Sequence, residues 1–217
     1  MYLTELHAHT EESSPCSHIS ASQLIRTYKE LGYTTIAITD HYTDKLLTCE
    51  NPEIVVEQFL EGYNIALATG NKIGVNVLLG MEIRFTTEKE DYLVYGITRE
   101  FLIDNYDICK KNIAELRKQL EESSTTYFIS QAHPGRSICK YPTCLDGIEI
   151  FNAMNHEKKM NTIAENYSTE YNLIPTSGTD CHSNKVIAKG GISTQEPIDT
   201  IDILINILKR NKFKLIV

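Results

Sequence analysis

The chain has 217 residues, of which 41% are hydrophobic, and a formal net charge of −8. This length and composition can bury a sizeable core, so we expect one folded domain over residues 1–217 and exclude an intrinsically disordered chain. The acidic balance disfavours nucleic acid as a partner, because nucleic-acid binding needs a basic surface.

The sequence shows no pattern typical of a targeting signal. No run of 18 apolar residues predicts a membrane span, and residues 1–5 lack the basic and apolar regions of a signal peptide. The six cysteines show no C-x-x-C spacing. We therefore expect reduced thiols, a cytoplasmic location and no membrane partner, while the oligomeric state stays open.

Strand-like and helix-like segments alternate in the first half of the chain. Ser20 and Gln23 form a capping box, and Gly32 is a fitting helix stop. Pro52 suits the first turn of a second helix, which Gly70 is expected to end. The predicted elements are strands at residues 2–9, 34–39, 74–85 and 92–97, and helices at 20–32 and 51–70.

The second half continues the alternation. We predict helices at residues 107–122 and 156–172 and from Pro197 onward, strands at 127–132, 147–151 and 173–177, and an edge strand at 213–217. Strands that alternate with helices indicate parallel β/α units. Their number and length favour a small barrel over a flat sheet.

Two histidines follow the first predicted strand. His7 and His9 share one face of that strand and suit a metal ion, although a surface strand with two solvated histidines would look the same. Five of the seven histidines lie where a strand meets the next loop, and the carboxyl ends of barrel strands form the functional face. This clustering favours a metal site. The polar residues at these ends are His7, His9, Asp40, His41, Glu82, His133, Asn152, Asp180 and His182, and Asp91 precedes the fourth strand.

Five ordered motifs resemble those of the PHP (polymerase and histidinol phosphatase) superfamily. They are His7-x-His9-Thr10, Thr39-Asp40-His41, Gly80-x-Glu82, His133-Pro134 and Gly178-Thr179-Asp180-x-His182. The resemblance covers nearly the whole chain. It implies an α/β fold with a distorted TIM-like (β/α)7 barrel, a cluster of two or three divalent metal ions, and phosphoester hydrolysis.

The resemblance also implies a ligand set. His7, His9 and Asp180 would bind a first ion, Glu82 would bridge to a second ion that His133 also binds, and His41 and His182 would bind a third. Two positions depart from the family pattern. Glu12 is the expected third-ion ligand, with Cys16 and His18 as further candidates, and Asp91 replaces a histidine on the second ion. Mixed imidazole and carboxylate ligands suit Zn, Mn or Fe.

The predicted reaction is metal-assisted hydrolysis of a small phosphorylated substrate, with Glu82 and Asp180 as the central catalytic carboxylates. Arg136 is expected to act on the phosphate, and Arg84 to bind it as well, while a surface arginine is the alternative for Arg136. Asn152 would contact substrate or stabilise a turn. Asp40 is expected to orient neighbouring groups rather than to bind metal.

Other functions share parts of this pattern. A histidinol-phosphate phosphatase and a PHP-type nuclease are alternatives within the family. Histidinol-phosphate phosphatases are usually longer than this chain, and a nuclease fits its acidic net charge less well. An amidohydrolase also begins with His-x-His, but no suitable strand-end lysine follows. A non-catalytic metal-binding structural domain is the alternative of another class.

Overall fold

The computed structural model of the chain describes residues 1–135, 137–154 and 158–217. Its centre is a curved sheet whose strands follow the order β10-β9-β1-β2-β4-β5-β6-β7-β8, with the short β3 beside β4. The strands are β1 (Tyr2–Ala8), β2 (Tyr33–Ile38), β3 (His41–Tyr42), β4 (Asn76–Arg84), β5 (Asp91–Tyr95), β6 (Phe128–Gln131), β7 (Gly147–Asn152), β8 (Ile174–Gly178), β9 (Gly191–Thr194) and β10 (Lys214–Ile216).

The sheet curves round until β1 lies beside the end of β8. Ala8 and Cys181 form an isolated parallel bridge there, and the Cys181 amide donates to the His7 carbonyl. The sheet is thereby nearly closed into a barrel. The predicted distorted TIM-like barrel is confirmed.

Two strands depart from the parallel pattern expected from the sequence: β9, which is antiparallel to β1 and β10, and β5. β5 pairs antiparallel with both β4 and β6, and Asp91 lies opposite Arg84. The connection at residues 85–90 is too short for a crossover helix, so it joins β4 to β5 as a hairpin. The start of β5 therefore lies at the same barrel edge as the carboxyl end of β4, which carries Glu82.

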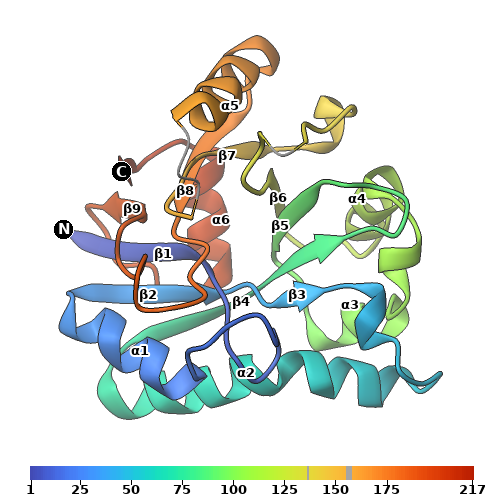
Figure 1. The fold of residues 1–217 in the computed structure, drawn as a ribbon, viewed down its shortest axis with the longest axis horizontal. Helices are drawn as coiled ribbons and strands as arrows, with labels where there is room; N and C mark the ends of the chain where they lie inside the picture. Colours follow the sequence, from blue (N-terminus) through green and yellow to red (C-terminus); the bar gives the residue numbers. More distant parts are fainter. Residues whose placement is uncertain (136, 155–157) are drawn as a thin grey trace.

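Helices surround the barrel: α1 (Ala21–Glu30), α2 (Pro52–Ile73), α3 (Arg99–Asp104), α4 (Ile113–Glu122), α5 (Lys158–Tyr171) and α6 (Ile201–Lys209). In Figure 1, α1 and α2 lie below β1, β2 and β4, and α6 stands behind the strands. The Ser20 hydroxyl accepts from the Gln23 amide at the start of α1, as the predicted capping box requires.

Several predicted boundaries were wrong. Gly70 does not end α2, which continues to Ile73 and stops at the left-handed Gly74. A Cβ at Gly70 would lie 2.5 Å from the Val75 carbonyl oxygen, so this glycine permits close packing instead. α6 begins at Ile201 rather than Pro197, because Thr200 caps it. α4 begins at Ile113, after an Asn112 cap, and α3 and β9 were not predicted.

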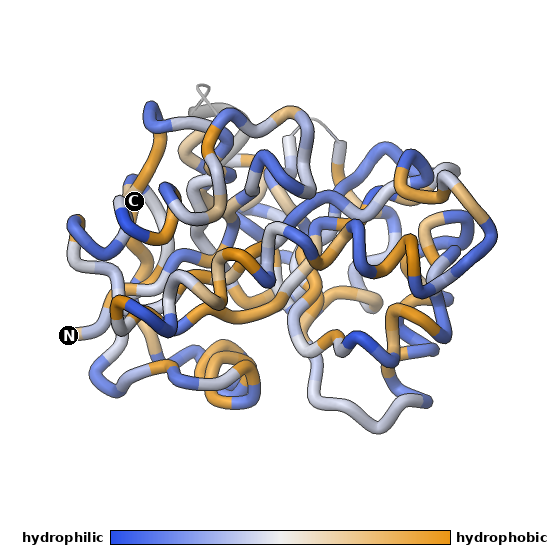
Figure 2. The backbone as a smooth tube through the Cα atoms, turned by 90° about the horizontal axis from the view of Figure 1, so that it is seen from below, coloured by the Kyte–Doolittle hydropathy of each residue, from blue (hydrophilic) through white to orange (hydrophobic). Residues whose placement is uncertain are grey.

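Three apolar clusters fill the space between the barrel and its helices. One packs α1 and α2 on β1 and β2, one packs α2, α3 and α4 on β4, β5 and β6, and one packs strand residues such as Leu6 and Leu93 on α6. Hydrophobic and hydrophilic residues alternate along the helical turns in Figure 2, as this one-sided packing requires. None of the helices is long and apolar enough to cross a membrane, for the residues described.

Candidate metal centre

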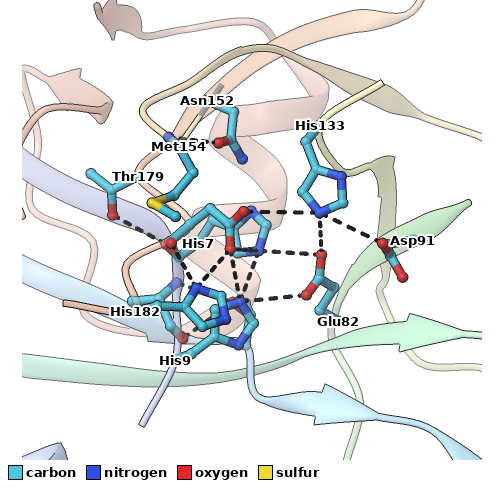
Figure 3. A network of polar contacts seen from close by, with 12 residues as sticks. His7, His9, Glu82, Asp91, His133, Asn152, Met154, Thr179 and His182 are labelled. Atoms are coloured by element: carbon cyan, nitrogen blue, oxygen red, sulfur yellow. Dashed lines mark hydrogen bonds and ion pairs between the residues drawn. The ribbon is translucent and has the colours of Figure 1, made fainter. Parts of the chain in front are cut away.

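Three overlapping groups of histidine and carboxylate side chains lie at the carboxyl end of the barrel strands (Figure 3). Within each group, one potential ligand atom per residue lies within 4.8 Å of the others. Glu82 belongs to two groups, and so does His9. The first group is His7, His9, Glu82 and Asp180; the second is Glu82, Asp91 and His133; the third is His9, His41 and His182.

The first group joins the beginning of the barrel to its end. The end of β1 carries His7 and His9, and Asp180 follows β8 in a left-handed conformation with φ of 53°. The Nε2 atoms of the two histidines lie 3.1 Å apart, and Asp180 Oδ1 lies 3.5 Å from the first and 3.3 Å from the second. These side chains are buried, so their nitrogen and oxygen atoms converge on a point shielded from water.

The second group is built by the β4–β5 hairpin and the end of β6. His133 Nε2 lies 2.8 Å from Glu82 Oε1 and 3.7 Å from Asp91 Oδ2. His133 also has a left-handed φ of 27°, a conformation that a non-glycine residue keeps only where its surroundings enforce it. The other Glu82 oxygen, Oε2, is buried and lies 2.8 Å from His41 Nδ1 and 3.4 Å from His9 Nε2, without a hydrogen bond of good geometry. A buried carboxylate oxygen that faces two imidazole nitrogens fits a metal ligand.

The third group lies nearer the surface. The side chains of His41 and His182 are 28% and 18% exposed, and their ring centroids are 5.6 Å apart. His41 Nδ1 lies 2.8 Å from Glu82 Oε2, and His182 Nδ1 lies 2.9 Å from the Asp180 carbonyl oxygen. Both of these contacts use Nδ1 of the ring.

Two buried glutamates, neither of them predicted as a site residue, hold the first group in place. Glu149 Oε1 lies 3.1 Å from His7 Nδ1, while its Oε2 accepts from the His133 amide and from the Asn152 side chain. Glu5 accepts from the backbone amides of His7 and Thr179. One sequence feature could have identified these glutamates: each is an acidic residue inside an otherwise apolar strand. Glu5 lies in Leu-Thr-Glu-Leu, and Glu149 lies in Ile-Glu-Ile.

Burial and mutual contact shift the protonation of these groups. Burial alone would raise the pKa of Glu82 and of Asp180, but the neighbouring imidazoles, His7 first, hold both well below their usual values. Burial would lower the pKa of His41, yet Glu82 raises it to about 10. Burial, then the neighbouring His41, lowers the pKa of His9 to about 3. Without metal, protons on some imidazoles therefore balance the buried carboxylates, and divalent ions could take their place.

The remaining predicted residues lie in different settings. Both carboxylate oxygens of Glu12 accept from the Ala21 amide at the start of α1, and Glu12 belongs to none of the three groups. Arg84 donates from Nε and Nη2 to Asp91, and Asn152 donates to Glu149 and accepts from the Met154 amide. Arg136 lies outside the described residues.

Asp40 and Cys16 lie beside the groups. Asp40 accepts from the Thr10 amide and hydroxyl and from the Ser14 hydroxyl, and burial raises its pKa to about 6. It thereby anchors the loop after β1, as expected for an orienting residue. The exposed thiol of Cys16 hydrogen-bonds to His182 and His41, which lower its pKa to about 6.

A cavity of about 940 Å³ opens over the three groups. Asp91, His133, Asp180, His41 and His182 form its floor, so a bound molecule can reach members of all three groups. The wall carries both signs of charge: Lys45, Arg84, Asp44, Glu12 and Glu61. This size and lining suit a small polar ligand.

The chain was compared with known proteins. A family model described as the PHP domain matches residues 5–215. No curated protein matches the chain in sequence.

Several solved structures share the fold at low sequence identity. A protein assigned as a metal-dependent phosphoesterase from Bifidobacterium adolescentis has 16% identity and a TM-score of 0.59, with 96% of each chain covered. A two-domain protein from Bacteroides vulgatus, containing a predicted PHP-like metal-dependent phosphoesterase, has 13% identity and a TM-score of 0.68, with 99% of this chain and 64% of that chain covered. An amidohydrolase from Chromobacterium violaceum, with bound sulfate and no metal, has 13% identity and a TM-score of 0.58, with 99% and 98% covered.

Proposed function

Because the chain belongs to the PHP domain family, we propose that it is a metal-dependent phosphoesterase that hydrolyses a small phosphomonoester at a centre of two or three divalent ions. The observation that carries the proposal is the sharing of Glu82 and of His9 between neighbouring groups. Ions bound in groups that share a ligand lie next to each other, and neighbouring ions suit displacement at phosphorus.

The ligand assignment follows the three groups. Glu82 would be shared by the first two ions, and Zn, Mn or Fe suits the mixture of imidazole and carboxylate. When bound, these ions would polarise the phosphoryl oxygens and lower the pKa of a water towards neutrality. We assign His7, His9 and Asp180 to the first ion, His133 and Asp91 to the second, and His41 and His182 to the third.

Other residues of the chain would fix the ligands and meet the substrate. Glu149 holds the His7 ring through Nδ1, which directs Nε2 towards the first ion. Arg84 lines the cavity and is half exposed, and its bonds to Asp91 use Nε and Nη2. Its Nη1 would donate to a phosphate oxygen. We keep Arg136 as a second phosphate contact on the sequence argument alone.

The cavity and the charges bear on the substrate and its location. About 940 Å³ leaves room for an organic group attached to the phosphate. Asp44 and Glu61 on the wall would repel a polyanion, which disfavours a nuclease. All six cysteines are free, which fits the cytoplasmic location that we propose.

The test is a hydrolysis panel on the metal-loaded protein. We expect p-nitrophenyl phosphate to be hydrolysed and its bis-ester and amides to resist, with activity lost on chelation and restored by Zn²⁺ or Mn²⁺. A preference for the bis-ester would indicate a nuclease, and cleavage of amides alone an amidohydrolase. Histidinol phosphate as the best substrate would identify that phosphatase. Tight metal binding without hydrolysis of any ester would contradict the proposal and favour the non-catalytic domain.

A further inference from the structure

The third group depends on a side chain that the first group also uses. His9 is counted in it, but His9 Nε2 faces the first group, 3.3 Å from Asp180 Oδ1 and 3.1 Å from His7 Nε2. The other ring nitrogen, Nδ1, lies 3.4 Å from the Ser14 hydroxyl. If His9 binds the first ion, the third ion keeps only His41 and His182, and a site for one ion normally offers three or more protein ligands.

Cys16 lies beside His41 and His182, although its thiol, like the Glu12 carboxylate, belongs to none of the three groups. Its side chain is exposed to the cavity, and its thiol hydrogen-bonds to both His41 and His182. Glu12, the ligand expected from the sequence, uses both carboxylate oxygens on the Ala21 amide at the start of α1. Of these two candidates, the thiol is the one that hydrogen-bonds to both His41 and His182.

The loop that carries Cys16 is fastened to the backbone of every member of the third group. The Ser14 hydroxyl accepts from the His41 amide, the Ser17 hydroxyl donates to the His9 carbonyl, and the His18 amide donates to the His182 carbonyl. Residues on both sides of Cys16 are thus fixed relative to the three histidines. A side chain held in this way costs little conformational entropy when it binds a metal.

We propose that Cys16 is a thiolate ligand of the third metal ion, together with His41 and His182, and that this ion is zinc. The inference rests on the proposed metal centre. One sulfur and two nitrogens leave a coordination position open, as in catalytic zinc sites. Thiolate favours zinc over manganese or magnesium, so the third site would differ in metal preference from the carboxylate-rich second site.

The test is spectroscopic and does not depend on hydrolysis. Apoprotein is titrated with Co²⁺, and the thiolate-to-cobalt charge-transfer absorption in the near ultraviolet is recorded together with the number of ions bound per chain. We expect the band in the wild-type chain and in the control C144S, whose cysteine lies outside this cavity. The band and one ion should be lost in C16S, whereas C16D should keep the ion without the band.

A second readout needs no variant. Iodoacetamide should alkylate Cys16 in the apoprotein, and Zn²⁺ should protect it, as peptide mass spectrometry would show. The inference is overturned if the band survives in C16S, if the wild-type chain has no band, or if E12Q loses an ion that C16S keeps. Failure of the proposed function would look different: the band and the protection would be present, but no ester would be hydrolysed.

Discussion

The metal centre has a closed half and an open half. The closed half comprises the first and second groups, in which His7, Glu82 and Asp91 are at most 4% exposed. The open half comprises Cys16, His41 and His182 at the cavity wall. The closed half has as many carboxylates as imidazoles, whereas the open half has two imidazoles and a thiol.

With the proposed function, the closed half would retain metal ions and the open half would receive the incoming ligand. Buried carboxylates repel one another and need cations or protons for balance, so the closed half is suited to hold ions tightly. The open half faces the cavity, so an ion there would keep positions for an incoming ligand.

The largest effect is expected at the closed half. D180N removes the charge that both His7 and His9 face, at 3.5 and 3.3 Å. We expect kcat/KM for the phosphomonoester to fall about 1,000-fold, since several kcal/mol of charge stabilisation are lost. Circular dichroism should show an intact fold, and the exposed D104N is the control. Undiminished hydrolysis in D180N would contradict the assignment.

E149Q tests the support of the closed half. The amide can keep the hydrogen bond from Asn152 or the contact with His7, but it removes the charge that orients the His7 ring. Loss of such a partner costs about 10- to 100-fold in metal affinity. Competition with a chromophoric chelator measures this, with E165Q on the surface of α5 as the control. If E149Q binds metal with the affinity of the wild-type chain, the charge of Glu149 does not orient the His7 ring.

The open half should control the pH dependence of metal binding. Burial lowers the pKa of His41 and of His182, but Glu82 and Asp180 outweigh it and raise both pKa values to about 10. Metal needs the neutral rings, so affinity should rise from pH 6.5 towards pH 10, by about tenfold per pH unit for each proton displaced. Isothermal titration in buffers of different ionisation enthalpy counts the protons released, and H182Q should release fewer.

The metal-free protein should show the opposite trend. A histidine with a raised pKa binds its proton more tightly in the folded state. The stability that it adds is complete below pH 6.5 and is lost as pH rises through about 10. Urea unfolding of the apoprotein at several pH values measures this, and a free energy of unfolding that increases over the range would contradict it.

The smallest effect is expected at Glu12. E12Q weakens a cap of α1, so the free energy of unfolding should fall by about 1 kcal/mol. Metal content should not change, in contrast to C16S. Urea unfolding and metal analysis of both variants separate a cap from a ligand.

Much of the barrel edge could be predicted from the sequence because period-two strands end in polar residues. Short motifs placed His7, Glu82 and Asp180 at strand ends, and the structure brings these residues together. The antiparallel β5 was missed, since the strand pattern does not record direction and only the short 85–90 connection reveals it. Glu149 was missed because its role depends on partners far away in the chain.

The loop after β1 shows a different kind of limit. Glu12 and Cys16 are both reasonable ligands by residue type. Only the three-dimensional path of the loop places the carboxylate on the start of α1 and the thiol on His41 and His182. Residue chemistry narrows the third-ion ligand to a few candidates, and the contacts of the folded loop are the basis for proposing Cys16.

The bridge between Ala8 and Cys181 has a consequence for synthesis on the ribosome. β1 leaves the exit tunnel early, but the residues that complete the first group, Asp180 and its neighbours, leave almost a whole chain length later. The nascent chain therefore cannot gain stability from the first ion until the barrel can close, because contacts so distant in sequence form late. Binding of that ion would then report completion of the fold rather than initiate it.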